Sequence, residues 1–368
     1  MKVRDIHRIM SEWAPPAIAW ERDNVGLQCG DPEANIRAVL VALDPTEEVI
    51  DEARRKRANV IVTHHPLLFK PQWSVTPTTT EGRCIHGLIR HGIALYSAHT
   101  NLDFTREGTS FALAEVLGLK DLGFLERSYH VDRKIVTFVP VEHADAVASA
   151  MAEAGAGRIG NYDECSFRSE GTGTFRGSPA SNPAVGRKGK LEHAHETKVE
   201  MIAPKWAVDD VLGAMRRAHP YEEVAYDLYP LENASDKFGM GVAGTLPQSI
   251  RLSAFLLRIK RLLGSGTLRW TGNPRSTIRR VAVCGGSGGE LLESAIKAGT
   301  DLFVTADLKY HAFHDARGRI ALVDAGHYET ELPIVNVVVR RLRDEFRLRG
   351  GTIPVYAASR STNPVRYV

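Results

Sequence analysis

Cysteine is scarce in this chain, and its few cysteines lie far apart. The 368 residues include only four, none of which form a CxxC pair: Cys29, Cys84, Cys165 and Cys284. Disulfide frameworks and thiolate zinc sites both depend on closely spaced cysteines. The spacing therefore argues against a disulfide-stapled fold and against a cysteine zinc site.

The sequence also lacks a dominant charge sign and a long apolar run. Lysine and arginine number 47 against 44 acidic residues, and the net charge of +3 is too small to indicate nucleic acid or a membrane as partner. One dense basic run, Arg54–Arg57, follows acidic residues on a predicted helix, where cations favour the C-terminal end; a phosphate-binding patch is the alternative. The N-terminus has no apolar signal-peptide core and no run approaches membrane-spanning length, so we expect a cytoplasmic protein.

Strand and helix patterns alternate in the first third of the chain and again in its last quarter. This alternation is typical of an α/β layer with parallel strands. Residues 127–234 differ, because their two βαβ-like halves indicate a ferredoxin-like α+β module. We predict an α/β core in two lobes, 1–126 and 235–368, interrupted by this insert. The glycine-rich segment 232–247 is predicted to be the return linker.

Two adjacent histidines stand where a predicted strand ends. His64 and His65 follow the β-branched run 60–62, and Pro66 then removes a backbone donor and prevents a regular ladder. Successive residues of a strand point to opposite faces, so the two imidazoles can converge only if the chain turns here. The pair is either structural or half of a metal site.

Further metal-ligating side chains follow two other predicted strands. Asp103 lies just beyond the strand 93–97, and His327 and Glu331 are four residues apart, which places them on one face of a helix. The ends of strands are where ligands bind in α/β architectures. Each feature alone has a structural explanation as a turn residue, a helix cap or a solvated pair. The combination at three strand ends indicates a metal site.

The ligand set of three imidazoles and two carboxylates exceeds the need of one catalytic zinc ion, which takes three protein ligands and water. It suits two divalent ions about 3.5–4 Å apart, with one carboxylate as a bridge. Imidazole and carboxylate ligands fit Zn, Fe, Mn or Co and select poorly among them.

Other candidate residues support weaker hypotheses. His99 is a candidate donor that orients the Asp103 carboxylate, and His311 beside Tyr310 is a candidate general acid or base; a purely structural role is the alternative for each. The glycine-rich run 284–290 either presents backbone N–H groups to a phosphate or forms a tight strand-to-helix turn. It lacks the lysine and hydroxyl residues of a P-loop. Asn24 either reaches the site or makes a turn.

Five motifs occur in the order seen in one widespread family. They are DNVGLQCGD (23–31), VTHHPLLF (62–69), YSAHTNLD (96–103), TADLKYHAF (305–313) and GHYETE (326–331). Over essentially its whole length the chain resembles the Nif-three-like proteins, the GTP cyclohydrolase I type 2 homologues. The insert resembles the PII/CutA-like module of the longer bacterial members. The resemblance implies a toroidal homohexamer and a dinuclear metal centre held by His64, His65, Asp103, His327 and Glu331.

The resemblance also implies a metal-dependent hydrolase, in which metal-activated water attacks a nucleotide-like substrate, as at C8 of GTP. A neighbouring side chain such as His311 would move a proton. The alternative is a metal-binding regulatory protein with a ligand-sensing insert and no turnover. This chain departs from the family pattern at Gln28 and Cys29, and at Ala306, which replaces a glycine. We therefore expect a different pocket wall and a differently shaped loop at these positions.

Overall fold

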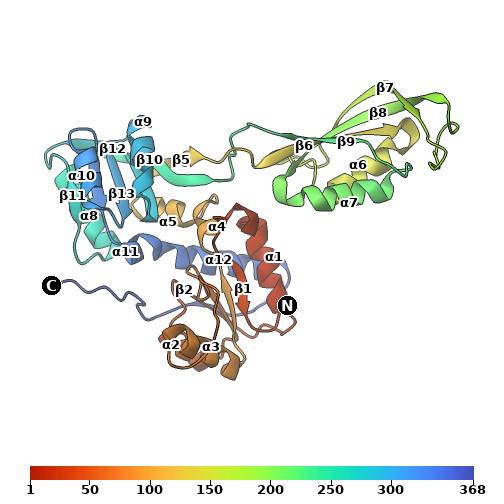
Figure 1. Ribbon diagram of the computed structural model, residues 1–368. Helices are drawn as coiled ribbons and strands as arrows, with labels where there is room; N and C mark the ends of the chain where they lie inside the picture. The colour runs from red at the N-terminus through yellow and green to blue at the C-terminus, as the bar shows by residue number, and fades with distance from the viewer. The chain divides into compact units, whose positions relative to one another are not determined.

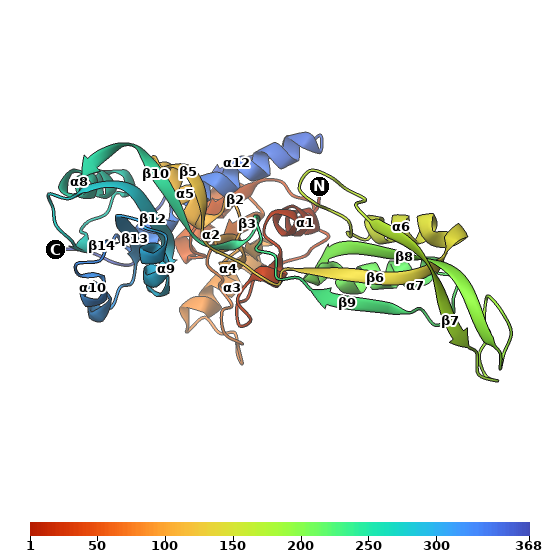
Figure 2. The same cartoon turned by 90° about the horizontal axis from the view of Figure 1, so that it is seen from above.

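The computed structural model describes residues 1–368, which form two compact units (Figures 1 and 2). The core unit comprises Met1–Arg127 and Asp236–Val368, and the insert unit comprises Ser128–Ser235. The chain therefore leaves the core unit once and returns to it once. None of the helices combines the length and the apolar character needed to cross a membrane.

The first sheet of the core unit has five strands and is covered on both faces. In spatial order they are β1 (Gly26–Cys29), β4 (Ala94–Ser97), β3 (Val60–Thr63), β2 (Val39–Ala42) and β15 (Val355–Ala357). All neighbours run parallel except β1, which is antiparallel to β4. The three central strands are buried at every residue, as parallel strands between two helical layers are.

Four helices supply those two layers. One face packs against α1 (Val3–Trp13) and α12 (Pro333–Leu348), and the other packs against α2 (Glu47–Arg55) and α3 (Thr80–His91). The apolar side of α12 is buried here, through Ile334, Val338 and Leu342. Burial of this helix therefore does not require a second copy of the chain.

The second sheet of the core unit has six strands. In spatial order they are β11 (Arg269–Thr271), β14 (Ala321–Asp324), β13 (Leu302–Ala306), β12 (Thr277–Ser287), β10 (Gly239–Arg251) and β5 (Lys120–Arg127). The central β12, β13 and β14 run parallel and the outer strands are antiparallel. Figure 2 shows α8 and α10 on opposite sides of β13 and β14.

The helices of this half pack on both faces of the six-stranded sheet. One face carries α5 (Thr109–Val116) and α8 (Leu252–Leu263), and the other carries α9 (Leu292–Lys297) and α10 (Tyr310–Ala316). Two short helices, α4 (Thr100–Asp103) and α11 (His327–Glu331), follow strands β4 and β14 and carry predicted ligands.

The prediction of a linker over 232–247 is wrong for its second half, because β10 begins at Gly239 and lies between β12 and β5. Its glycines serve close packing in the sheet. A Cβ at Gly239 would lie 2.3 Å from the carbonyl oxygen of Glu126, so no larger residue fits there. Glycines that permit close approach within a strand hide the alternation by which strands are recognised.

The insert unit is a four-stranded antiparallel sheet with two helices on one face. Along the chain its elements are β6 (Asp132–Pro140), α6 (Ala144–Glu153), β7 (Phe167–Arg176), β8 (Leu191–Pro204), α7 (Val208–Ala218) and β9 (Tyr226–Pro230). The spatial order is β7-β8-β6-β9, and Figure 1 shows α6 and α7 on the same side. Apolar side chains of both helices pack on β6 and β8, so the other face of the sheet has no helix.

Candidate metal centre

The chain turns after β3 in a way that brings both histidines together. The N–H groups of His64 and His65 still donate to the carbonyl oxygens of Ala42 and Leu43 at the end of β2, but the imidazole centroids lie only 5.0 Å apart. The turn is held by Gln28, whose Oε1 accepts the backbone N–H groups of Leu67 and Leu68 at 2.9 and 3.0 Å. Gln28 therefore fixes the segment that presents the histidine pair.

The His64 imidazole is directed toward two carboxylates. Its Nδ1 lies 2.9 Å from the carbonyl oxygen of Ala98, which can only accept, so Nδ1 carries a proton and donates this hydrogen bond. Its Nε2 faces Oδ1 of Asp103 at 3.5 Å and Oε1 of Glu331 at 3.7 Å. Asp103 is carried there by α4, directly after β4.

The His65 imidazole is held in the same manner by a carboxylate. Its Nδ1 lies 2.7 Å from Oδ1 of Asp44, and its Nε2 lies 3.0 Å from Oε2 of Glu331. The hydroxyl of Thr362, in the C-terminal segment, donates to the other oxygen of Asp44. Three segments that are distant in the sequence thus determine the orientation of one imidazole.

The third imidazole comes from the six-stranded half of the core unit. On α11, Nε2 of His327 lies 3.1 Å from Oε1 of Glu331, and its Nδ1 lies 2.7 Å from Oδ2 of Asp307. Asp307 has a left-handed backbone (φ +54°) immediately after β13, and this bend turns its carboxylate toward His327. The chain therefore bends at Asp307, directly after Ala306, and an aspartate tolerates this conformation.

The glycine-rich run 284–290 makes room for Glu331. Gly286 has φ +64°, and a Cβ there would lie 2.2 Å from Oε1 of Glu331. The N–H of Gly286 donates to Thr330, and those of Gly285 and Gly288 donate to Ser110 and Thr305. These donors are used within the protein, which favours the tight-turn interpretation over a phosphate cradle.

Several buried polar atoms of this cluster have no hydrogen-bond partner. They are Nε2 of His64, Oδ1 of Asp103 and Oε2 of Glu331, the last despite its short approach to His65. Buried polar atoms are rarely left unpaired, because each costs its full desolvation penalty. A bound cation would satisfy all three at once, so these residues fit a metal.

Ligand atoms within 4.8 Å of one another form two groups that share His65. One contains His64, His65 and His99, and the other contains His65, His327 and Glu331. His99 is thus grouped with the predicted ligands, while Asp103, a predicted ligand, belongs to neither group.

Charges at the centre are strongly coupled. Burial raises the pKa of Glu331, but the imidazoles of His64, His327 and His65 outweigh it and hold that pKa well below its usual range. Burial lowers the pKa of His65, but the neighbouring carboxylates of Asp44 and Glu331 prevail and raise it to about 10. The hydrogen bond to Glu331 raises the pKa of His327 to about 9. The Glu331 carboxylate is thus stabilised by positive charge around it. Protonated imidazoles or bound metal ions can supply that charge.

His99 lies closer to the centre than the sequence hypothesis required. Its ring centroid is 5.3 Å from that of His64 and 5.5 Å from that of His65. Its Nδ1 lies 2.9 Å from Oδ1 of Asp23, and Oδ2 of Asp23 accepts the N–H of Thr100 at 3.0 Å. Burial raises the pKa of Asp23, but the hydrogen bonds from His99 and Thr100 prevail and lower it to about 2. His99 is thus positioned by Asp23 and presents Nε2 to the histidine pair.

Two other predicted residues lie outside the centre. His311 is exposed on α10, its ring packs against Tyr310, and no hydrogen bond or ion pair joins it to the cluster. Asn24 donates to the carbonyl oxygen of Leu68 at 2.6 Å and so has the turn-making role. A cavity of about 100 Å³ adjoins the centre, with Trp20, Phe104, Met240, Ser287 and Glu290 in its lining.

The sequence analysis missed the carboxylates that hold the imidazoles. Asp23, Asp44 and Asp307 each accept an Nδ1 proton, yet none was singled out as a functional residue. The available signal was position, because Asp44 and Asp307 follow strands β2 and β13 directly, as the predicted ligands follow theirs.

The fold and the site together define a class: an α/β protein in which two sheets bring imidazole and carboxylate groups to a shared candidate metal centre. The chain belongs to the Duf34/NIF3 (NGG1p interacting factor 3) family, whose sequence profile matches residues 1–364. The resemblance inferred from the five motifs is therefore confirmed.

Proteins similar in sequence or structure match this chain over almost its whole length. Proteins named GTP cyclohydrolase 1 type 2 homolog are 40% identical in Halalkalibacterium halodurans, over 98% of this chain and 97% of that one, and 40% identical in Mycobacterium leprae, over 99% and 94%. A crystal structure of a Bacillus cereus protein related to NIF3 is 38% identical, covers 100% of this chain and 99% of its own, and has a TM-score of 0.83.

Proposed function

We propose that this protein is a dinuclear-metal-dependent hydrolase acting on a small, nucleotide-like molecule. The observation that carries the proposal is the position of Glu331, whose two oxygens lie 3.0–3.7 Å from Nε2 atoms of three imidazoles. The site would hold two divalent ions, each of which would be Zn, Fe, Mn or Co. The residues that would hold them are His64, His65, Asp103, His327 and Glu331.

Bound there, two divalent ions would supply Lewis-acid polarisation of a substrate oxygen and a lowered pKa for water. The protein's own contribution is orientation. Asp44, Asp307 and the Ala98 carbonyl each accept a hydrogen bond from an Nδ1, so that once the rings lose the Nε2 proton three Nε2 lone pairs would be directed at the centre. Because each imidazole is fixed by a second partner, the ligand set is preorganised before any substrate arrives.

His99 is the side chain best placed to meet a substrate beside the ligands. It lines the cavity together with Asp103 and Glu331, and Asp23 fixes its Nδ1. Its Nε2 is then available to hold or accept a proton at the reacting end of a substrate. His311, exposed on α10, has no contact with this cavity and does not take that role.

The cavity limits how much of a substrate can enter. Its volume of about 100 Å³ is below the range of about 300–1,000 Å³ that small-molecule sites usually occupy. The rings of Trp20 and Phe104, with centroids 5.8 Å apart, form an apolar wall, and Ser287 and Glu290 add polar groups. Such a space admits the reacting edge of a ring while the remainder of a nucleotide-like molecule stays outside. The names of the relatives support a guanine nucleotide as the first substrate to test.

We also propose that the insert unit is a ferredoxin-like, PII/CutA-like module and that the chain assembles as a homohexamer. The βαββαβ order of the insert unit supports the first statement. The second rests on the family resemblance, and sedimentation of the purified protein tests it, because a monomer or dimer would refute it.

Metal content of the purified chain tests the proposed function. We expect about two transition-metal ions per chain, with metal loss in His65→Ala and Glu331→Gln and no loss in His311→Ala, the matched control. The loaded protein is then offered GTP and other nucleotides, and release of a hydrolysed product supports the hydrolase. No metal after reconstitution overturns the metal centre, and two bound ions without turnover of any nucleotide favour a regulatory protein.

A further inference from the structure

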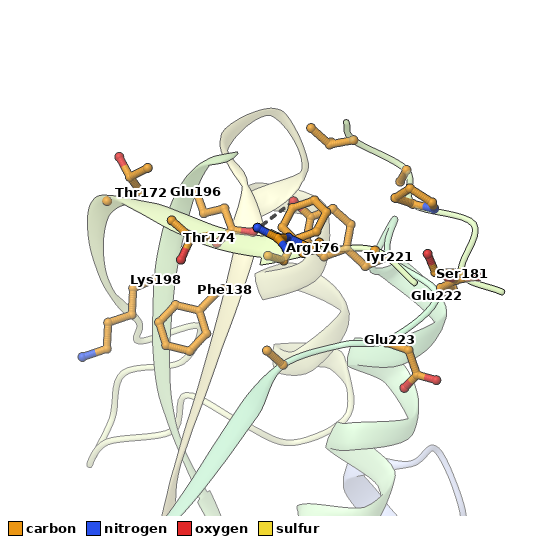
Figure 3. Close-up of a pocket in the computed structure, with 18 of the residues that line it drawn as sticks. Phe138, Thr172, Thr174, Arg176, Ser181, Glu196, Lys198, Tyr221, Glu222 and Glu223 are labelled. Carbon is orange, nitrogen blue, oxygen red and sulfur yellow. Dashed lines mark hydrogen bonds between the residues drawn. The ribbon is translucent and has the colours of Figure 1, made fainter. Parts of the chain in front are cut away.

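The insert unit contains a cavity of about 670 Å³ (Figure 3). It lies on the sheet face opposite α6 and α7, because Phe138 on β6 and Glu196 on β8 alternate with the residues that pack against those helices, such as Val139 and Val199. The loop 177–185 and the segment 221–223 complete its wall. The volume is within the range of about 300–1,000 Å³ that small-molecule sites occupy.

Two glycines create the hollow. Gly171 stands directly opposite Glu196 in the register of β7 and β8, and Gly173 follows two residues later on the same face. A Cβ at Gly173 would lie 2.0 Å from Oε2 of Glu196. The absent side chains thus leave open space above the sheet and let the glutamate carboxylate lie across it.

Glu196 is a buried carboxylate with one oxygen unused. The residue is 9% exposed, its Oε1 accepts the hydroxyl of Tyr221 at 2.9 Å, and its Oε2 accepts no hydrogen bond. The side chain is therefore largely enclosed, while Oε2 is free to accept a hydrogen bond from a donor in the cavity.

The partner of Glu196 is itself held in place. The backbone N–H of Tyr221 donates to Nδ1 of His219 at 3.1 Å, and Nε2 of His219 donates to the carbonyl oxygen of Phe138 at 3.0 Å. This chain of contacts fixes the phenol beside Glu196, so the carboxylate keeps one oxygen bonded and presents the other to the cavity.

The lining combines aromatic rings with an excess of negative charge. Phe138, Phe175 and Tyr221 contribute rings, and the last two have centroids 6.3 Å apart. Four carboxylates (Glu170, Glu196, Glu222, Glu223) face two basic side chains (Arg176, Lys198), an excess of two negative charges. Lys198 pairs with Glu200, and the Arg176 side chain is exposed. Aromatic faces around a carboxylate attract organic cations through the ring quadrupole and the opposite charge.

We propose that the insert unit binds a small organic cation with a flat or apolar body in this pocket. The cationic N–H groups of the ligand donate to Oε2 of Glu196, and its body lies against the rings of Phe138, Phe175 and Tyr221. This site is separate from the candidate metal centre and does not depend on the function proposed there.

Three probes of one shape and different charge test the proposal. Benzamidine, benzamide and benzoate carry a charge of about +1, 0 and −1 near neutral pH, and each is titrated into the full-length chain with binding followed by ligand-observed NMR. We expect saturable binding of benzamidine and at least about tenfold weaker binding of benzamide, since a charge-assisted hydrogen bond is lost. Equal affinities, tighter binding of benzoate, or no saturable binding of benzamidine overturns the proposal. The last result is also expected if a second copy of the chain fills the pocket.

Two variants locate the binding to the carboxylate. Glu196→Gln keeps the shape and the Tyr221 hydrogen bond, and we expect at least about a tenfold loss of benzamidine affinity. Glu223→Gln is the matched control, because its carboxylate lies on the far side of the pocket (Figure 3), and we expect a change of less than about twofold. An unchanged affinity in Glu196→Gln refutes the assignment. The wild-type probe comparison stands on its own should that variant fold poorly.

Discussion

The Nδ1 atom of His65 lies 2.7 Å from Oδ1 of Asp44, and this carboxylate is shared with the hydroxyl of Thr362. Asp44 follows β2 and His65 follows β3, and these two strands are parallel neighbours. The proximity of the pair is thus a direct result of parallel pairing. The C-terminal segment adds a third contact, so the orientation of one proposed ligand depends on residues from both ends of the core unit.

Replacing Asp44 tests whether this contact serves metal binding. We expect Asp44→Asn to weaken metal affinity by about 10–100-fold, because the amide no longer fixes the His65 ring or raises its basicity. Metal competition with a chelator measures the effect. Asp51→Asn is the control, since Asp51 is exposed on α2 and pairs only with Arg54. Equal affinities in both variants would show that Asp44 has no part in the site.

Asp307 offers a second test with little backbone disturbance. Its φ of +54° is tolerated by asparagine as well as aspartate, so Asp307→Asn changes the charge beside His327 and keeps the bend. We expect metal affinity to fall about 10–100-fold and the unfolding midpoint of the metal-free protein to change little. A large loss of stability without a change in metal affinity would contradict this role.

The proposed ligands were accessible from the sequence because each follows a strand, and the ends of parallel strands meet at one edge of a sheet. The mixed α/β class followed from the alternating patterns and is confirmed by the sheets and by the NIF3-related structures. The residues that hold the imidazoles were harder to find. Asp44 and Asp307 stand after strands as the proposed ligands do, but the sequence does not show which histidine each carboxylate contacts. Asp23 meets His99 across 76 positions and Asp44 meets His65 across 21.

Glycine limited the sequence analysis in two places, for one physical reason. The predicted linker contains β10, and the run 284–290 continues as the end of β12 and makes room for Glu331. Both were interpreted as loops because glycine is the usual turn residue. In both, glycine is needed because another group approaches the backbone closely, and that group belongs to a segment far away in the chain.

Gly286 provides a test of that close approach. We expect Gly286→Ala to displace Glu331, because the added Cβ would lie 2.2 Å from Oε1, and to abolish stoichiometric metal binding. Gly92→Ala is a matched control: Gly92 has a similar φ of +59° at the end of α3 but nothing within 4 Å of a Cβ. It should cost about 1–2 kcal/mol of unfolding free energy and leave metal content unchanged. Full metal content in Gly286→Ala would refute the crowding argument.

Asp23 predicts a specific acid dependence of stability in the metal-free protein. Its folded pKa of about 2 lies below the ordinary value near 4, so the folded state favours the charged form. The stabilisation, about 1–2 kcal/mol, is complete above the unfolded pKa and is lost as pH falls from about 4 through 2. Urea unfolding of wild type and Asp23→Asn, in the presence of a chelator, measures it. The difference between them in unfolding free energy should be larger at pH 6 than at pH 3. A difference that is independent of pH would mean that folding does not lower the pKa of Asp23, and would contradict the prediction.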